Sequence, residues 1–401
     1  MKVGIYNEPR EGGIGGSEIS VAVLAEAFAS REEVEIIHHK EYMTRKRLAE
    51  VSGTDLRSVR MRYVDAEPYS FGSGHSPLHR YRQARSWQAA LTEPYDQFIS
   101  FTHGFPPFCH AKKGALVVLF PLHPRPFWWT HEQAPQNRLS FWRHIKSAYH
   151  EWEWQKRLDT YQIKVTISRF SQKWTKRRWG IQCDVIYPPA DTSFKPRRKR
   201  NIILSVGRFT STGHSKKQLE MVSAFAGLRR LDRWRYFSVG GLTDAVGDLQ
   251  YFESVSRKAK DGRVRVLANV ERSRLQRLYE QAKIFWHAAG YEDDQNRPEL
   301  SEHFGLATVE AMAGGCVPIV VNRGGQPEIV EHGVNGFVWN TLDELKDYTS
   351  ALMLDERLRL HMAKAAQARA AAFSRKRFVD SFLNLLREGT AHTEVRTARR
   401  R

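Results

Sequence analysis

The sequence has no apolar run approaching the about 20 residues that a membrane-crossing helix needs, and it has only three cysteines. Residues 1–6 predict the start of a strand and not a secretory signal. Cys109, Cys183 and Cys316 stand far apart, so they form neither a disulfide framework nor a metal-binding spacing. We therefore expect a cytoplasmic protein in a reducing compartment, without membrane-spanning helices.

Acidic residues are fewer than basic ones: the sequence has 44 Asp and Glu and 63 Lys and Arg, which gives a formal net charge of +19. Such an excess indicates anionic partners, which are nucleic acid, anionic lipid or phosphorylated substrates. Part of it lies in the basic runs 195–200 and 397–401, which we interpret as solvated. The sequence lacks a recognition-helix motif, a zinc spacing and an aromatic RNA-binding stretch, so nucleic acid is the less favoured partner.

What the sequence does have is an alternation of short apolar strands and helical stretches, repeated in both halves of 401 residues. This alternation predicts α/β architecture with parallel, doubly wound sheets. Pro188 and Pro189 interrupt regular structure between the halves. We expect an N-terminal domain over 1–190 and a C-terminal domain over 191–372.

A glycine-rich loop, 12–16, joins the strand 2–6 to a helix with an apolar face. Strand, glycine loop and helix is the layout of a turn that approaches phosphate. The loop has neither the G-x-G-x-x-G spacing of a dinucleotide site nor the Gly-Lys-Ser/Thr of a P-loop. We expect Gly15 and Gly16 to let a small polar ligand reach the backbone, and a bare tight turn is the alternative.

Two histidines, His103 and His123, follow the predicted strands 97–101 and 115–120. Ligands of open α/β sheets bind beyond the carboxyl ends of the strands. The pattern favours a functional role for His123 and leaves that of His103 open.

Residues 125–180 hold seven tryptophans among many lysines and arginines. Aromatic and basic residues on one helix are typical of an interfacial membrane helix. They are equally typical of a helix that covers a sheet with long basic side chains. Core packing is the favoured interpretation, and peripheral contact with an anionic membrane is the alternative.

In the second half, Arg208 follows a strand that ends at Gly207, and Lys216 precedes the next helix. An arginine fork and a lysine point charge suit a diphosphate, and they can neutralise a departing phosphate without a metal. The acidic run 292–294 has no matching set of metal ligands. We interpret it as solvated or as an acceptor contact.

The segment 301–315, SEHFGLATVEAMAGG, carries two carboxylates, Glu302 and Glu310. We expect Glu302 in the loop before a helix and Glu310 about two turns along it. The amides around Gly305, between Phe304 and Leu306, lie at the predicted helix start, where an anion is favoured. Carboxylates suit sugar hydroxyls because they accept two hydrogen bonds in fixed directions.

This block, with the glycine turns 322–330 and 333–338 that follow it, resembles the donor-binding half of group-1 (family 4-like) retaining glycosyltransferases. Gly207-Arg208 and Lys216 resemble that family's diphosphate-binding pair, with Lys217 as the alternative lysine. The resemblance is dense over 165–340 and sparse over 40–160. It implies the GT-B fold, in which two Rossmann-like domains face a central cleft. It also implies that a helix over 373–388 crosses back to the first domain, before a flexible basic tail over 389–401.

The resemblance further implies transfer of a sugar from a UDP- or GDP-linked donor, with retention of configuration, no metal and no cofactor. The acceptor would be a glycan, a lipid-linked molecule or a small molecule. The implied catalytic residues are His123, Glu302, Arg208 and Lys216. The implied donor-binding residues are Gly15, Gly16, Arg208, Lys216, Phe304, Gly305, Leu306 and Glu310, with Glu302 on the sugar and Glu310 on the ribose.

Two other functions are open at this point. A sugar-nucleotide epimerase on the same fold would use the same donor residues. A basic nucleic-acid-binding protein would explain the charge, with binding that depends steeply on salt. A non-catalytic relic of the fold is disfavoured because Arg208, Lys216, Glu302 and Glu310 are all present.

Overall fold

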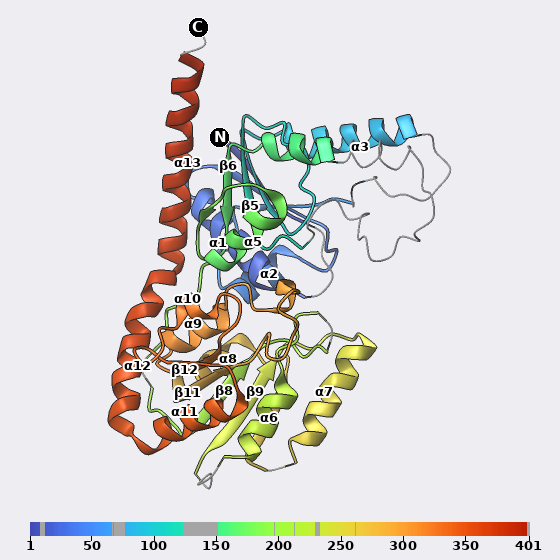
Figure 1. Ribbon diagram of the computed structural model, residues 1–401. Helices are drawn as coiled ribbons and strands as arrows, with labels where there is room; N and C mark the ends of the chain where they lie inside the picture. Colours follow the sequence, from blue (N-terminus) through green and yellow to red (C-terminus); the bar gives the residue numbers. More distant parts are fainter. Residues whose placement is uncertain are drawn as a thin grey trace. The chain divides into compact units, whose positions relative to one another are not determined.

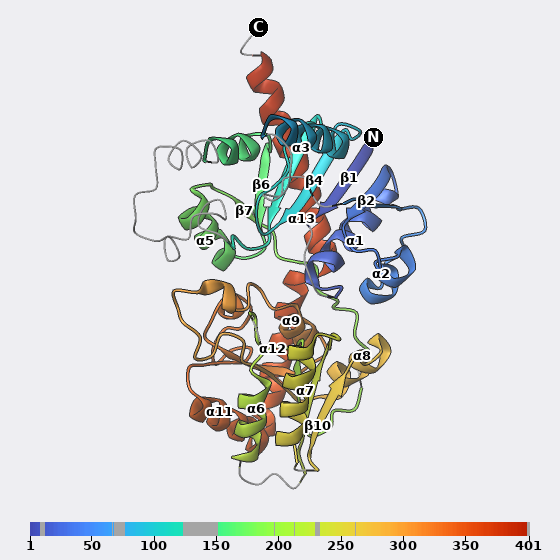
Figure 2. The same ribbon diagram turned by 90° about the vertical axis from the view of Figure 1, so that its right-hand side faces the viewer.

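The computed structural model describes residues 1–8, 13–65, 67, 77–122, 151–195, 197–211, 213–228, 233–260 and 262–398 (Figures 1 and 2). The chain divides into two compact units. The N-terminal unit comprises Met1–Ile167, Ser171–Ile186 and Val379–Arg401, and the C-terminal unit comprises Ser168–Phe170 and Tyr187–Phe378.

The N-terminal unit is built on a sheet in the order β3-β2-β1-β4-β5-β6-β7. Every neighbouring pair in it is parallel. The strands are β1 Lys2–Asn7, β2 Glu33–His38, β3 Arg60–Tyr63, β4 Gln97–Thr102, β5 Lys113–Val118, β6 Ile163–Thr166 and β7 Asp184–Val185. The central strands are almost wholly buried, as expected of a parallel sheet that helices cover on both faces.

The helices of this unit are α1 Gly16–Ala29, α2 Arg45–Ser52, α3 Pro77–Thr92 and α5 Arg169–Trp179, and residues 151–159 are also helical. Figure 2 shows α1 and α2 side by side near β2. A core cluster joins Leu91 of α3 and Leu158 to the strand residues Phe98 and Leu116. Trp154 and Trp179 lie in the same cluster, so these two tryptophans of the aromatic, basic segment serve core packing.

The C-terminal unit has a second parallel sheet, in the order β10-β9-β8-β11-β12-β13. The strands are β8 Ile202–Val206, β9 Arg235–Gly240, β10 Val264–Ala268, β11 Ile284–His287, β12 Val317–Val321 and β13 Phe337–Trp339. The helices are α6 Gln218–Ala226, α7 Val246–Lys258, α8 Arg272–Gln281, α9 Leu306–Ala313, α10 Gln326–Ile329, α11 Leu342–Leu354 and α12 Glu356–Ala370. Two 3-10 turns, η1 Pro298–Leu300 and η2 Ala371–Phe373, complete the list.

Alternate residues of each strand enter two separate cores, because successive side chains of a strand point to opposite faces. Ile203 packs with residues of α6, α7 and α11. Ile202 and Leu204 pack with residues of α8 and α9. Figure 1 shows α6 and α7 side by side along the sheet. The predicted doubly wound parallel sheets are therefore confirmed in both units.

The segment 40–94 contains more regular secondary structure than its composition predicts. In addition to α3, it forms the helix α2 and the edge strand β3. The last helix, α13, runs Arg375–Ala398 and so includes residues expected as a flexible tail. No proline interrupts residues 389–398, and the helix therefore continues. Within the described residues, no helix is both long enough and apolar enough to cross a bilayer.

Candidate functional site

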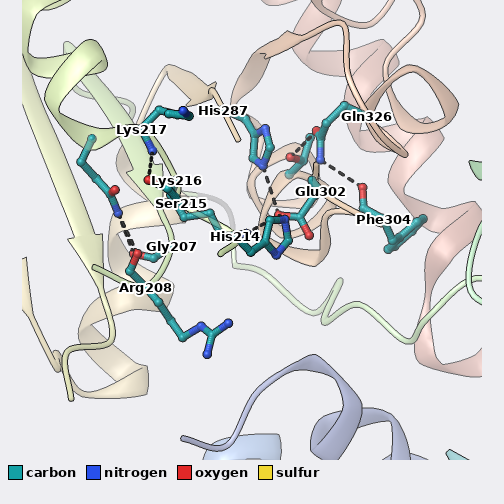
Figure 3. A network of polar contacts seen from close by, with 12 residues as sticks. Gly207, Arg208, His214, Ser215, Lys216, Lys217, His287, Glu302, Phe304 and Gln326 are labelled. Carbon is teal, nitrogen blue, oxygen red and sulfur yellow. Dashed lines mark hydrogen bonds and ion pairs between the residues drawn. The ribbon is translucent and has the colours of Figure 1, made fainter. Parts of the chain in front are cut away.

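The C-terminal unit places a buried carboxylate against a lysine and two histidines (Figure 3). Oε2 of Glu302 accepts a hydrogen bond from Nζ of Lys216 at 2.5 Å, and it lies 3.3 Å from Nε2 of His287. Nε2 of His214 is 3.9 Å from the same oxygen. Glu302 lies in the connection from β11 to α9, and His214 and Lys216 lie in the connection from β8 to α6, so two strand–helix connections meet at this carboxylate.

The basic groups around Glu302 differ in charge at neutral pH. Burial by itself would raise the pKa of Glu302, but the charge of the neighbouring Lys216 lowers it well below its usual range. Burial and the nearby Lys216 lower the pKa of His214 to about 3, and burial also lowers the pKa of His287. At neutral pH both histidines are therefore uncharged, and Lys216 is the cation that faces Glu302.

Two glycines allow the loop that carries Arg208 and Lys216 to pack closely against neighbouring backbone and side-chain atoms. A Cβ on Gly207 would lie 2.5 Å from Cγ of Lys216, and one on Gly240 would lie 1.9 Å from the carbonyl oxygen of Gly207. Neither position can hold a side chain without moving its neighbours. Arg208 is exposed, and its guanidinium makes no hydrogen bond or ion pair with any described residue. Its guanidinium lies apart from the other labelled groups in Figure 3, available to an anion.

The two adjacent lysines have different partners. Nζ of Lys217 donates to Oδ1 of Asp293 at 2.7 Å, in a pair whose side chains are 15% and 18% exposed. Lys216, and not Lys217, is therefore the lysine at Glu302. The interpretation of the run 292–294 as solvated is wrong for Asp293, because a cation from a distant segment covers its carboxylate. The alternative, an acceptor contact, stays a prediction.

The start of α9 is fixed by neutral hydrogen bonds. Gly305 precedes the helix with φ +126, and a Cβ there would lie 2.1 Å from Nε2 of Gln326. This amide donates to the carbonyl of Phe304 at 3.0 Å, and its oxygen accepts from Oγ1 of Thr308 at 2.8 Å. Leu306 is the first helical residue, so the amides at the start of α9 have no carbonyl within the helix to bond.

Glu310 is the fifth residue of α9, little more than one turn from the helix start instead of the expected two. It is half-buried. Burial and the negative charge of Asp191 raise the pKa of Glu310 to about 7, and the positive charge of Arg272 opposes this. Arg272 itself pairs with Asp191, Nη2 to Oδ2 at 2.5 Å. A carboxyl with such a pKa can take up a proton or release one near neutral pH.

In the N-terminal unit, Gly15 precedes α1 and Gly16 is its first residue. The amide of Gly15 donates to Oε2 of Glu18 at 2.8 Å. Nζ of Lys40 bridges Oε1 of Glu18, at 2.6 Å, and the carbonyl oxygen of Gly13, at 3.1 Å. The predicted glycine loop is therefore held by a buried ion pair.

The histidine predictions have different outcomes. The loop of His103 is held by Glu8, whose Oε2 accepts from the hydroxyl of Thr102 at 2.9 Å and from the amides of His103 and Gly104. His123 lies outside the described residues, so its predicted role stays a prediction.

Sequence reasoning missed several residues that hold these sites. His287, His214 and Gln326 surround the predicted Glu302 and Gly305, and Lys40 braces the N-terminal loop. The one available signal was position, since His287 ends a predicted strand. Over the described part of the chain, no group of three or more His, Cys, Asp or Glu side chains is arranged to hold a metal ion.

Two parallel-sheet units, with charged residues at strand ends and helix starts, define the GT-B class of fold. In agreement, the crystal structure of Alr3699/HepE from Anabaena in complex with UDP has a TM-score of 0.67. It is 16% identical to this chain, and the match covers 97% of this chain and 100% of that one. A further structure of the same protein contains UDP-glucose, with a TM-score of 0.67 and 18% identity over 97% of this chain and 100% of that one.

Residues 190–369 match the family described as glycosyl transferases group 1. The matched segment contains Arg208, Lys216, Glu302 and Glu310, so the C-terminal part of the chain is similar to this family.

Two curated relatives were also found. A GDP-Man:Man(3)GlcNAc(2)-PP-Dol alpha-1,2-mannosyltransferase of Dictyostelium discoideum is 24% identical over 230 residues, which is 53% of this chain and 43% of that protein. A D-inositol 3-phosphate glycosyltransferase of Saccharomonospora viridis is 33% identical over 97 residues, 23% of this chain and 22% of that protein. The matched regions thus span less than half of either relative.

Proposed function

We propose that this chain is a retaining glycosyltransferase that moves a sugar from a nucleotide diphosphate sugar to an acceptor. The observation that carries the proposal is the arrangement at the strand ends of the C-terminal unit. An unpaired, exposed Arg208 stands on the loop that also carries Lys216, and Lys216 faces Glu302 just before the start of α9. Cations beside a helix start suit a diphosphate, and a carboxylate suits the hydroxyls of the attached sugar.

In this proposal Arg208 and Lys216 stabilise the diphosphate as it departs. The bond between the anomeric carbon and the diphosphate oxygen breaks, and the acceptor oxygen bonds to that carbon on the same face. The acceptor proton passes to the departing diphosphate oxygen. Preorganised cations that meet developing negative charge are a large source of rate enhancement. Glu302 orients the sugar, and His123 stays a predicted contact of the sugar or the acceptor.

The donor is proposed to be UDP- or GDP-linked. The solved Anabaena structures are complexes with UDP and UDP-glucose, and the Dictyostelium relative is named for GDP-Man. Glu310 would accept hydrogen bonds from the ribose hydroxyls. The glycines Gly15 and Gly16 are proposed to meet phosphate or acceptor through their backbone, while Phe304, Gly305 and Leu306 shape the donor site.

The acceptor is proposed to be a glycan or a lipid-linked molecule. The Dictyostelium relative is named for an acceptor linked to PP-Dol, and a net charge of +19 suits such an anion or an anionic membrane surface. We propose a cytoplasmic enzyme at the inner face of a membrane. Its three free cysteines are buried and separate, as expected in a reducing compartment.

We propose that transfer needs no metal and no cofactor, because Arg208 and Lys216 can supply the positive charge that the leaving group requires. Thermal shifts with UDP, GDP, ADP and their sugars, with and without EDTA, test this proposal. A rise in melting temperature with one nucleotide, unchanged by EDTA and lost in Glu310→Ala, is expected. Conversion of the donor without any acceptor would favour the epimerase instead. No shift, with salt-sensitive binding of RNA or DNA, would favour nucleic-acid binding.

A further inference from the structure

Lys217 has a backbone conformation that lysine rarely adopts. It precedes α6 with φ 57 and ψ 42, in the left-handed region. Three non-glycine residues in the described part of the chain have positive φ, namely Lys217, Asn269 and Glu292, and Glu292 adjoins Asp293, the partner of Lys217. An L-residue is disfavoured there because its Cβ approaches the following carbonyl oxygen. Such a conformation persists only when the surrounding structure holds it.

The ion pair with Asp293 holds this turn. Nζ of Lys217 donates to Oδ1 of Asp293 at 2.7 Å, and the amide of Lys217 donates to Oγ of Ser215 at 3.3 Å. Oδ2 of Asp293 is buried and accepts no hydrogen bond from a described residue. Both side chains are more than four-fifths buried, so water screens the pair only weakly. Asp293 comes from the connection between β11 and α9, far from Lys217 in the sequence.

The turn at Lys217 directs the residues on either side of it. Lys216 reaches Glu302 at 2.5 Å. Gln218 is buried, and its Nε2 donates to the carbonyl oxygens of Gly207 and Arg208 at 3.2 and 3.0 Å. Figure 3 shows Lys216 directed towards Glu302 while Lys217 extends in another direction. Relaxation of φ at Lys217 would rotate Lys216 and Gln218 relative to each other, and both contacts could not be kept.

We propose that Asp293 is a positioning residue of the donor site. By binding Lys217 in the left-handed conformation, it keeps Lys216 on Glu302 and Gln218 on the backbone of Arg208. Asp293 thereby places both cations proposed to meet the diphosphate without touching the ligand itself. The predicted effect on turnover rests on the proposed glycosyl transfer, whereas the hold on the turn is a property of the C-terminal unit alone.

The test uses Asp293→Asn, Lys217→Gly and the double variant of the full chain. Glycine adopts positive φ without the Cβ penalty, so Lys217→Gly removes the need for the ion pair. With UDP- and GDP-sugars as donors, Asp293→Asn is expected to lower kcat about tenfold, which corresponds to a slight misplacement of Lys216. The donor KM should change little. In the Lys217→Gly background, the same substitution should change kcat less than about twofold.

Melting temperatures of the four proteins give a second readout that does not depend on activity. Lys217→Gly should raise the melting temperature more in the Asp293→Asn background than in the wild type. Additive shifts would show that Asp293 does not hold the turn and would overturn the proposal. Coupled shifts with an unchanged kcat in Asp293→Asn would overturn the positioning role.

Two controls separate the possible failures. Asp294→Asn changes the exposed neighbouring carboxyl and should leave kcat and the coupling unchanged. A wild type that converts none of the donors would refute the proposed function and with it the effect on turnover. The melting-temperature cycle would then still support or overturn the hold of Asp293 on Lys217.

Discussion

Two largely buried lysine–glutamate pairs in the described part of the chain differ in how many hydrogen bonds the carboxylate accepts. In the N-terminal unit, Lys40 and Glu18 are 9% and 5% exposed. Both oxygens of Glu18 are occupied, by Lys40, the amide of Asn7, the backbone of Gly15 and the hydroxyl of Ser17. Such a carboxylate has no capacity left for a ligand, and its task is to hold the glycine loop.

In the C-terminal unit, Lys216 and Glu302 are 15% and 18% exposed. Lys216 and His287 both contact Oε2, and Oε1 accepts no hydrogen bond from a described residue. The backbone beside Glu302 is held instead by the amide of Gln326, and the turn after Lys216 is held by the separate pair of Lys217 and Asp293. The difference teaches that the saturated carboxylate of Glu18 holds a loop, whereas Glu302 keeps one oxygen without a hydrogen-bond partner among the described residues, which suits a ligand.

The largest expected effect breaks the saturated pair. Lys40→Met should lower the free energy of unfolding by about 3–5 kcal/mol, because it leaves the carboxylate of Glu18 buried without its cation. Urea unfolding measures this change, and Lys216→Met is the matched control. The loss for Lys216→Met should be clearly smaller, because the side chain of Glu302 is 18% exposed against 5% for Glu18 and it keeps its contact with His287. Equal losses for both variants would remove the distinction between the pairs.

The second prediction concerns activity at the open pair. Arg208→Ala should lower kcat/KM for donor by about 10²–10³-fold, because one cation that meets the departing diphosphate is lost. Its melting temperature should stay within about 1 °C of the wild type, since Arg208 is exposed and unpaired. Near-normal turnover of this variant would refute the assignment of Arg208.

The third prediction uses pH. The pKa of Glu310 in the folded protein is raised to about 7. Its contribution to stability is therefore fully present at pH values below its pKa in the unfolded chain, and it is lost as the pH rises through 7. The pKa of Glu18 in the folded protein is lowered, because Lys40 and the Gly15 amide outweigh the effect of burial. The contribution of Glu18 to stability is therefore lost as the pH falls through this lowered pKa. Glu310→Gln should therefore raise the melting temperature at pH 8 and not at pH 4.5.

The control for this pH series is Glu18→Gln, which should lower the melting temperature at pH 8 and converge towards the wild type under acid. Melting curves between pH 4 and pH 8.5 show both trends. If the melting temperatures of the two variants change with pH in the same direction, the opposite pKa shifts assigned to Glu310 and Glu18 are incorrect.

The smallest expected effect comes from Ser17→Ala, which removes one neutral donor from Glu18 and leaves the ion pair intact. The free energy of unfolding should fall by about 0.5–1.5 kcal/mol, the net value of one hydrogen bond. Donor binding, measured by calorimetry, should be unchanged. A loss as large as that of Lys40→Met would mean that the hydroxyl, and not the cation, holds the loop.

The sequence predicted the elements whose signals are local. Strands such as β8 and β12 are short apolar runs, and Gly305 marks a helix start, so the residues beside them could be located. The edge strand β3 was missed because its residues are exposed or half-buried and show no apolar alternation.

The partners of the predicted residues could not be read in the same way. Lys40 is 22 residues from Glu18 along the chain, and Asp293 is 76 residues from Lys217. Nothing in the spacing of such pairs indicates that they meet, because the packing of separate strand–helix units brings them together. The choice between Lys216 and Lys217 likewise depended on the left-handed turn at Lys217, which no local pattern of lysines predicts.

Calorimetric titration of UDP, GDP and ADP into the wild type and Arg208→Ala, in the presence of EDTA, tests the central claim most directly. The account predicts that one nucleoside diphosphate binds the wild type and that Arg208→Ala weakens this binding by about tenfold or more, the value of a charge-assisted hydrogen bond. Equal affinity of both proteins for every nucleotide, or no binding to the wild type, would contradict a donor site at Arg208, Lys216 and Glu302.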